Sequence, residues 1–325
     1  MAEAAVVSLL RVRGLQVAIG AARPVDGIDL DVAAGEMLGI VGESGSGKSM
    51  TLRAILRLLP PVAQTTGEVS WQGADLLGLP EPRMRAIRGG EIGMVFQEPM
   101  SALNPVLTIG LQITESITTH AGMRGAAART RAAALLDQVG IPDARRRLSN
   151  YPHEFSGGMR QRAMIAAALA GGPKLLLADE PTTALDVTIQ DQILKLMLRL
   201  KDELSMSVVI VTHDLGVVAG TCDRVVVLYA GRVMESGPVE AVFARPAHAY
   251  TLGLLRSLPG AARAHSRLGG IPGTPPDPRA LPPGCRFAPR CVYAIDACRA
   301  VDPALVSVGP GRLSACIRAD VVQAA

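Results

Sequence analysis

The chain carries MLGIVGESGSGKS at residues 37–49, and this stretch decides the fold of its 325 residues. The first five residues are apolar and predict a short buried strand. A helix is expected from the end of the stretch through Leu59, before Pro60 and Pro61 stop it. Between strand and helix lies the pattern G-x-x-x-x-G-K-S, so the sequence predicts an α/β protein with a phosphate-binding loop.

The residues of this loop suit phosphate chemistry. Glycines let the backbone wrap around phosphates without Cβ clashes, and the backbone amides and helix N-terminus attract an anion. Lys48 is expected to reach the β- and γ-phosphates of ATP, and Ser49 to ligate Mg²⁺. The expected nucleotide-binding residues are Gly42, Glu43, Ser44, Gly45, Ser46, Gly47, Lys48 and Ser49.

Polar residues follow other predicted strands, where open α/β sheets place their ligands. The apolar run Leu175–Ala178 leads into Asp179 and Glu180. Asp179 is expected to hold hydrated Mg²⁺, and Glu180 to polarise the attacking water. Gln97 could touch Mg²⁺ and this water, and His213 could contact the γ-phosphate. Taken singly, such a glutamine is more often a loop residue, and such a histidine is more often structural.

The segment FSGGMRQR at residues 155–162 stands just before these acids. Ser156 is well placed as an N-cap, and Gly157 and Gly158 would allow an anion to approach closely. Without its context the segment predicts only a helix cap. In this context it indicates an ATPase that completes its active site with a second subunit.

Composition and charge set wider limits. The net charge is only +4 and the one notable basic run is Arg145–Arg147, so nucleic acid is not indicated as a partner. No apolar run approaches the roughly 20 residues that a membrane helix needs. The start, Met1-Ala2-Glu3, has no signal-peptide pattern. These features predict a cytoplasmic protein whose membrane role, if any, comes through a partner.

With these motifs in this order, residues 8–260 resemble the ATP-binding subunit of an ABC transporter. The resemblance implies a P-loop ATPase with a RecA-like core, an antiparallel β subdomain and a helical subdomain at about residues 98–160. It also implies that two such domains clamp two ATP molecules, each held between one P-loop and the other subunit's signature. The corresponding motifs are the Walker A loop at 42–49, the Q-loop Gln97, the signature at 155–159 with Ser156, Gly157 and Gly158, the Walker B strand with Asp179 and catalytic Glu180, the D-loop with Asp186, and the switch His213.

Further segments are similar to the peptide and nickel importer branch of this family. They are FSGGM at 155–159, EPMSALNP at 98–105, TTALDVT at 182–188, and RPAHAYT at 245–251, where alanine replaces a proline of the HPYT-type motif. This similarity implies ATP hydrolysis that powers di- or oligopeptide import at the cytoplasmic face of the membrane. Implied partners are two integral membrane permeases, an extracellular binding protein and a second ATPase. The second ATPase is expected to be a paralogue that forms a heterodimer, with an identical copy as the alternative. Alternatives are an importer of nickel or another small solute, or a soluble ABC ATPase with a redox-sensing cluster.

One departure concerns the adenine contact. The residue before Gly20 is usually aromatic in this family and stacks on adenine, but here it is Ile19. An apolar contact would remain without stacking, so looser nucleotide selectivity is expected.

The C-terminal part differs in composition. We expect the ATPase domain over residues 1–258, and a proline-rich linker with a small extension over 259–325. Cysteines cluster in the extension with intervals of five, six and seventeen residues, which favours metal over disulfides in a cytosolic protein. Thiolate-only ligation at wide spacing suits a [4Fe–4S] cluster, as the importer branch also implies; zinc and free or disulfide-bonded cysteines are the alternatives. The predicted ligands are Cys285, Cys291, Cys298 and Cys316.

Overall fold

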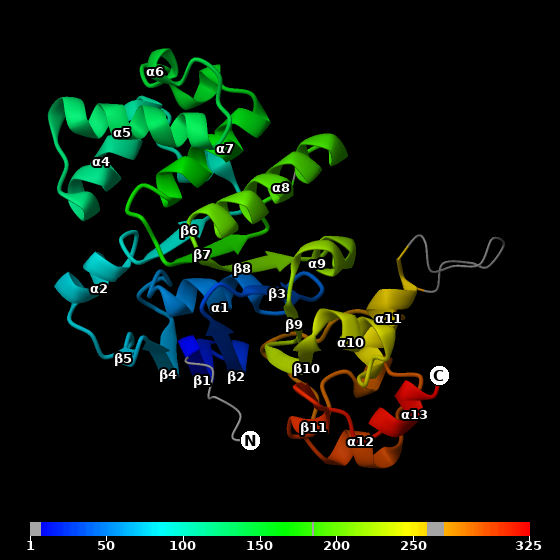
Figure 1. The fold of residues 1–325 in the computed structure, drawn as a ribbon. Helices are drawn as coiled ribbons and strands as arrows, with labels where there is room; N and C mark the ends of the chain where they lie inside the picture. The colour runs from blue at the N-terminus through cyan, green and yellow to red at the C-terminus, as the bar shows by residue number, and fades with distance from the viewer. Residues whose placement is uncertain (1–7, 184, 259–269) are drawn as a thin grey trace, which may run out of the picture. The chain divides into compact units, whose positions relative to one another are not determined.

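The computed structural model describes residues 8–183, 185–258 and 270–325, drawn as a ribbon in Figure 1. The chain divides into two compact units. Unit 1 comprises Met1–Ala33, Met37–Leu77 and Val211–Ala325, and unit 2 comprises Ala34–Glu36 and Gly78–Ile210. The domain boundary at residue 258 and the helical subdomain at about 98–160 stay predictions.

Unit 1 contains a four-stranded antiparallel sheet in the order β2-β1-β4-β5. Its strands are β1 (Ser8–Ile19), β2 (Ala22–Ala33), β4 (Gln64–Trp71) and β5 (Ala74–Asp75). In the sequence, Leu10, Val12 and the run 15–19 predict two strand pieces. They form the single strand β1, along much of which buried and exposed residues alternate. The sheet therefore presents one apolar face to a core.

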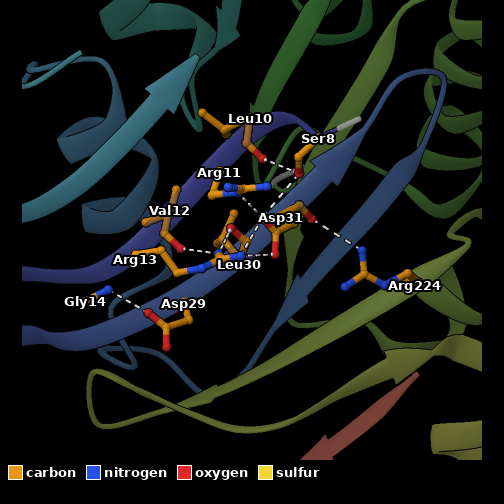
Figure 2. Close-up of polar contacts among 10 residues, drawn as sticks. All are labelled: Ser8, Leu10, Arg11, Val12, Arg13, Gly14, Asp29, Leu30, Asp31 and Arg224. Atoms are coloured by element: carbon orange, nitrogen blue, oxygen red, sulfur yellow. Dashed lines mark hydrogen bonds and ion pairs between the residues drawn. The ribbon is translucent and has the colours of Figure 1, made fainter. Parts of the chain in front are cut away.

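Polar contacts also join β1 to the edge strand β2 (Figure 2). The carboxylate of Asp31 accepts hydrogen bonds from Arg13 Nη2, at 2.9 and 2.6 Å, and from Ser8 Oγ, at 3.2 Å. At a bulge, the Gly14 N–H donates to Asp29 Oδ1 at 2.6 Å, with Gly14 in a left-handed conformation. Because the Arg13–Asp31 pair is substantially exposed, its contribution to stability is at most about 1 kcal/mol. Burial of the apolar face sets the register.

The other strands of unit 1 come from residues 37–41 and from the C-terminal third of the chain. β3 (Met37–Val41) runs parallel to β9 (Arg224–Tyr229), which pairs antiparallel with β10 (Arg232–Pro238). β10 pairs with β12 (Arg312–Ser314), and β12 with β11 (Val306–Gly309). The sequence of residues 224–237, with Ala230-Gly231 at the turn, predicts this hairpin, and the pairing of β9 with β10 confirms it. The C-terminal extension continues its sheet.

One predicted helix of unit 1 is shorter than expected. The helix after the phosphate-binding loop ends at Ile55 and not at Leu59, because Arg57 adopts a left-handed backbone with φ of 54°. The helical segments of this unit are α1 (Lys48–Ile55), α9 (Leu215–Thr221), α10 (Val239–Ala244), α11 (Ala249–Arg256), the 3₁₀ turn η2 (Ala288–Arg290), α12 (Asp296–Ala300) and α13 (Ala319–Gln323).

Unit 2 combines short parallel strands with most of the helices. β6 (Ile92–Val95) runs parallel to β7 (Leu175–Asp179), and β8 (Ser207–Thr212) leads the chain back into unit 1. Its helical segments are α2 (Glu81–Ile87), α3 (Pro99–Ala102), α4 (Ile109–Ala121), α5 (Gly125–Gln138), α6 (Ala144–Arg147), the 3₁₀ turn η1 (Pro152–Glu154), α7 (Gly157–Ala168) and α8 (Val187–Glu203).

Apolar residues recur about every 3.6 positions after Asp186 and predict a helix, which α8 confirms; they are Ile189, Ile193, Leu196, Leu200 and Leu204. Ile193, Leu196 and Leu200 are buried on one face, whereas Leu204 lies just beyond the helix and is 39% exposed. Within the described ranges, no helix has both the length and the apolar character needed to cross a membrane.

An aromatic cluster joins the body of unit 1 to the extension. Tyr229 ends β9, Tyr250 lies in α11, and Phe287 comes from the extension. The Tyr229 ring lies 4.7 Å from that of Tyr250 and 5.3 Å, edge on, from that of Phe287. The extension therefore shares a buried core with the rest of its unit.

A buried carboxylate fixes the segment before α11. Glu235, on β10, is fully buried and accepts hydrogen bonds from the N–H groups of Ala247, at 2.8 Å, and His248, at 3.0 Å. Arg312 of the extension donates to the same carboxylate at 3.1 Å. Burial raises the pKa of Glu235, and these hydrogen bonds oppose that shift. The contacts hold the RPAHAYT segment against the hairpin.

His248 makes the stability of this unit dependent on pH. Its Nδ1 accepts the Tyr250 N–H at 3.0 Å and caps α11, and burial lowers its pKa from 6.5 to about 4. As pH falls, the unfolded chain binds the proton before the folded chain does. The stability that the neutral, buried His248 contributes is therefore complete above pH 6.5 and is lost as pH falls from 6.5 through 4. Between pH 7 and 5 the folded state should lose about 2 kcal/mol from this residue.

The matched variant is His248→Asn, which can cap the helix but cannot titrate. Urea denaturation of the full chain at pH 7 and pH 5 should show a smaller loss of stability for this variant than for the natural protein. Equal losses in the two proteins would contradict the assignment.

Candidate functional site

The phosphate-binding loop connects β3 to α1 in a tightly wound conformation. Gly45 and Gly47 have left-handed φ angles of 77° and 101°, and a Cβ on Gly42 would meet the Leu228 carbonyl oxygen at 2.2 Å. Lys48 is buried, and its Nζ donates to the carbonyl oxygens of Gly42, at 2.8 Å, and Glu43, at 3.0 Å. These glycines are therefore required by geometry.

Two observations show that the loop suits a bound phosphate. The N-cap of α1 is Gly47, which has no side chain to bind the amides at the helix N-terminus. The hydroxyl of Ser46 is buried and has no hydrogen-bond partner within the described part of the chain. Nucleotide phosphates would satisfy both groups.

In unit 2, β7 ends at the two predicted acids. Asp179 is fully buried, and Glu180 follows with a left-handed φ of 46°, which is uncommon for a residue with a side chain. Glu180 Oε2 accepts hydrogen bonds from Thr183 Oγ1, at 2.8 Å, and Gln97 Nε2, at 3.3 Å. The structure thus brings together two residues that the sequence assigned to the attacking water. Strained backbone of this kind is typical of functional sites.

The signature segment forms the start of α7. Ser156 caps the helix by accepting the Met159 N–H at 3.3 Å, which confirms the predicted N-cap. Ser156 and Gly157 are exposed, and Phe155 is buried and anchors the segment. A Cβ on Gly158 would approach Ile189 Cγ2 to 3.0 Å. The exposed helix start could receive an anion from outside the chain.

The other predicted site residues have clear positions. Asp186 is the N-cap of α8, accepting the Ile189 N–H at 3.0 Å, and His213 is exposed after β8. Ile19 is half-buried at the end of β1. Their roles stay predictions, and Ala184 of the predicted D-loop lies outside the described residues.

The predicted Mg²⁺ ligands are divided between the units. Ser49 lies in the first turn of α1, in unit 1, whereas Gln97 and Asp179 lie in unit 2. The hydroxyl, amide and carboxylate oxygens are suitable ligands for this cation. Their joint binding of Mg²⁺ stays a prediction.

The cysteines of the extension leave the expected metal cluster a prediction. All five cysteines have free thiols, and across 8–183, 185–258 and 270–325 no group of three or more His, Cys, Asp or Glu is arranged to hold a metal. Burial raises the pKa of Cys285 to about 11 and raises those of Cys291 and Cys316, and the neighbouring thiols add to each shift. Without a metal ion, these three thiols are therefore neutral near pH 7, and a bound metal would displace their protons.

A contact of the phosphate-binding loop was missed from the sequence. Arg290, in the extension, forms a two-pronged ion pair with the Glu43 carboxylate, at 2.6 and 3.0 Å. The only available signal was an arginine between two of the clustered cysteines, in RFAPRC at 286–291.

Comparisons with known proteins agree with these motifs. The family described as ABC transporter matches residues 25–183, and the family described as oligopeptide/dipeptide transporter, C-terminal region, matches residues 234–298. A Brucella abortus protein named for peptide import and ATP binding is 53% identical over 293 residues, covering 90% of this chain and 88% of the relative. A Sinorhizobium fredii protein named for ATP binding in a peptide ABC transporter is 53% identical over 92% of this chain and 90% of its own.

Solved structures show the same fold. An ATP-binding cassette, solved as a post-hydrolysis dimer with ADP and phosphate, is 31% identical with a TM-score of 0.63, covering 71% of this chain and 98% of its own. CbiO1 of Clostridium perfringens, part of an ABC transporter complex, is 28% identical with a TM-score of 0.63, covering 73% of this chain and 91% of its own. The predicted ABC-type ATPase fold is confirmed.

Two neighbouring glycines test the geometry of the loop. Gly45→Ala adds only backbone strain, because its Cβ would meet nothing within 4 Å, and should cost about 1 kcal/mol of stability. Gly47→Ala adds a contact of 2.4 Å with the Pro24 carbonyl oxygen and should cost about 3 kcal/mol or more. Denaturation of both full-length variants measures the difference; equal costs would contradict the close packing at Gly47.

Proposed function

Because this chain belongs to the family of ABC transporter ATP-binding proteins, we propose that it hydrolyses ATP to power the import of peptides. The observation that carries the proposal is the match of residues 234–298 to the C-terminal region of oligopeptide and dipeptide transporters. Peptide import in the names of relatives from two genera supports the same substrate class.

We propose the following chemistry for the residues of the site. Lys48 would bind the β- and γ-phosphates of ATP in place of the loop carbonyl oxygens, and Ser49, Gln97 and Asp179 would hold Mg²⁺, which would offset charge on the phosphates. Glu180 accepts a hydrogen bond from the attacking water and polarises it towards the γ-phosphate.

Further groups complete the reaction. Gln97, already within hydrogen-bond distance of Glu180, orients the same water, and His213 contacts the γ-phosphate. Ile19 provides an apolar contact to the base, and Asp186 acts at the boundary with a second subunit.

A second ATPase subunit is part of this proposal. Ser156, Gly157 and Gly158 lie at the start of α7, with the first two exposed, and would bind the γ-phosphate of ATP held by the partner's loop. The related cassette that was solved as a dimer supports this arrangement. The partner would be a paralogue, and the pair would attach to two membrane permeases at the cytoplasmic face, with an extracellular binding protein delivering the peptide. No nucleic acid takes part.

Purification of the tagged chain from membranes of its own cells tests this function. The expected co-purifying proteins are two integral membrane subunits and a second ATPase, and peptide should stimulate ATP hydrolysis when the binding protein is added. Stimulation by nickel or another small solute, and not by peptide, would overturn the substrate class. Isolation without membrane subunits would favour a soluble ATPase.

Glu180→Gln separates binding from hydrolysis. The amide keeps the size of the side chain but cannot act as a base, so ATPase activity should fall by about 10²–10⁴-fold while ATP affinity stays within about twofold. Activity is measured by phosphate release, and affinity by equilibrium binding. Retained hydrolysis would remove Glu180 from the role of base.

We also propose a [4Fe–4S] cluster as the cofactor of the extension, with zinc as the alternative. Its support is the clustering of the four cysteines, whose thiols influence one another's pKa values. Full-length protein prepared without oxygen should be brown and contain about four irons per chain, and a Cys298→Ala variant should lose both. A colourless preparation with one zinc supports the alternative, and one without metal contradicts both.

A further inference from the structure

Glu43 of the phosphate-binding loop is held through each of its polar groups. Its N–H donates to the Tyr250 hydroxyl at 2.8 Å, and its carbonyl oxygen accepts from Lys48 at 3.0 Å. Its carboxylate is held by Arg290 through two bonds of 2.6 and 3.0 Å. Two of these three anchors belong to the C-terminal part of unit 1.

Arg290 is built into the extension as a fixed donor. It is 7% exposed, and its Nε donates to the Pro272 carbonyl oxygen at 2.7 Å. Nη1 also donates to the Tyr229 hydroxyl at 3.2 Å, and the guanidinium lies over the rings of Tyr229, at 5.7 Å, and Phe287, at 6.0 Å. These contacts fix the planar group in the orientation that a two-pronged carboxylate pair requires.

Nucleotide binding would affect the three contacts of Glu43 differently. Lys48 is proposed to bind the phosphates of ATP. Its hydrogen bond to Glu43 exists only while its ammonium group points at the loop carbonyl oxygens. The contacts from Tyr250 and Arg290 do not involve the Lys48 ammonium group. They can persist when ATP enters.

Charge gives Arg290 a second effect. Glu43 is the second residue of a loop that accepts a highly negative ligand, and its carboxylate would repel that ligand if it were unpaired. The paired guanidinium cancels this charge beside the loop.

We propose that Arg290 is a positioning residue for ATP: from the C-terminal extension, it fixes Glu43 and neutralises its charge, so that the phosphate-binding loop is ordered for the nucleotide. The extension is thereby part of the ATP-binding apparatus of its own chain. This inference rests on ATP binding at the loop and is independent of what is transported.

Replacement of Arg290 by Gln tests the proposal in the full-length protein. ATP affinity, measured by equilibrium binding, should fall about tenfold or more, and KM for ATP should rise more than kcat falls. Arg290→Lys keeps the charge but loses the fork, so it should lose less affinity than Arg290→Gln. The matched control is Arg279→Gln, which removes an exposed arginine of the C-terminal part whose partner, Asp277, lies two residues away.

Charge rescue distinguishes positioning from simple destabilisation. In the double variant Glu43→Gln/Arg290→Gln neither charge remains, so ATP affinity should recover part of the loss seen in Arg290→Gln. Wild-type affinity in a folded Arg290→Gln protein would overturn the proposal. If that variant does not fold, Arg290→Lys decides: a loss of affinity of about threefold or more supports the proposal, and wild-type affinity overturns it.

Discussion

The structure of unit 1 depends on buried arginines of the extension that meet acids of the body. Arg290 is one of three, and each is less than 10% exposed. A buried guanidinium must be paired, since leaving one unpaired costs about 3–5 kcal/mol, and its planar fork accepts few orientations. Three such pairs therefore restrict how the extension can pack on this unit. The pairs are Arg286 with Asp26, Arg290 with Glu43, and Arg312 with Glu235.

This attachment places the extension in contact with nucleotide-binding elements. Arg286 donates to the Ala230 carbonyl oxygen in the β9–β10 turn, and the N–H of the next residue, Gly231, donates to the Ser46 carbonyl oxygen at 3.0 Å. The loop is thus supported from the hairpin as well as through Glu43. Because Cys285 and Cys291 pack against the same core as Tyr229, the cysteines are neighbours of this support. The region that matches the oligopeptide/dipeptide transporter C-terminal family is thus structurally joined to the phosphate-binding loop.

A structural feature could be predicted from the sequence where its signal lies within a few neighbouring residues. The loop at 42–49, the cap at Ser156 and the hairpin at 224–237 could be predicted because their signals lie within a few residues. The Arg290–Glu43 pair joins residues 247 positions apart, and no local pattern reports such a distance. Cysteine spacing likewise predicts proximity but not protonation, which depends on burial that only the folded chain defines.

The left-handed backbone of Glu180 is the other feature that spacing could not reveal, and it bears on how the site works. A residue with a side chain remains in this conformation only where its surroundings fix it. Here a hydroxyl from Thr183 and an amide from Gln97 hold the carboxylate within unit 2. In unit 1, the phosphate-binding loop is held by the hairpin turn, Tyr250 and Arg290. The Glu180 carboxylate and the phosphate-binding loop are therefore each ordered by contacts within their own unit. ATP binding need not supply the energy that orders them. Its binding energy remains available for bringing subunits together, which is the step that an ABC transporter converts into movement of its membrane partner.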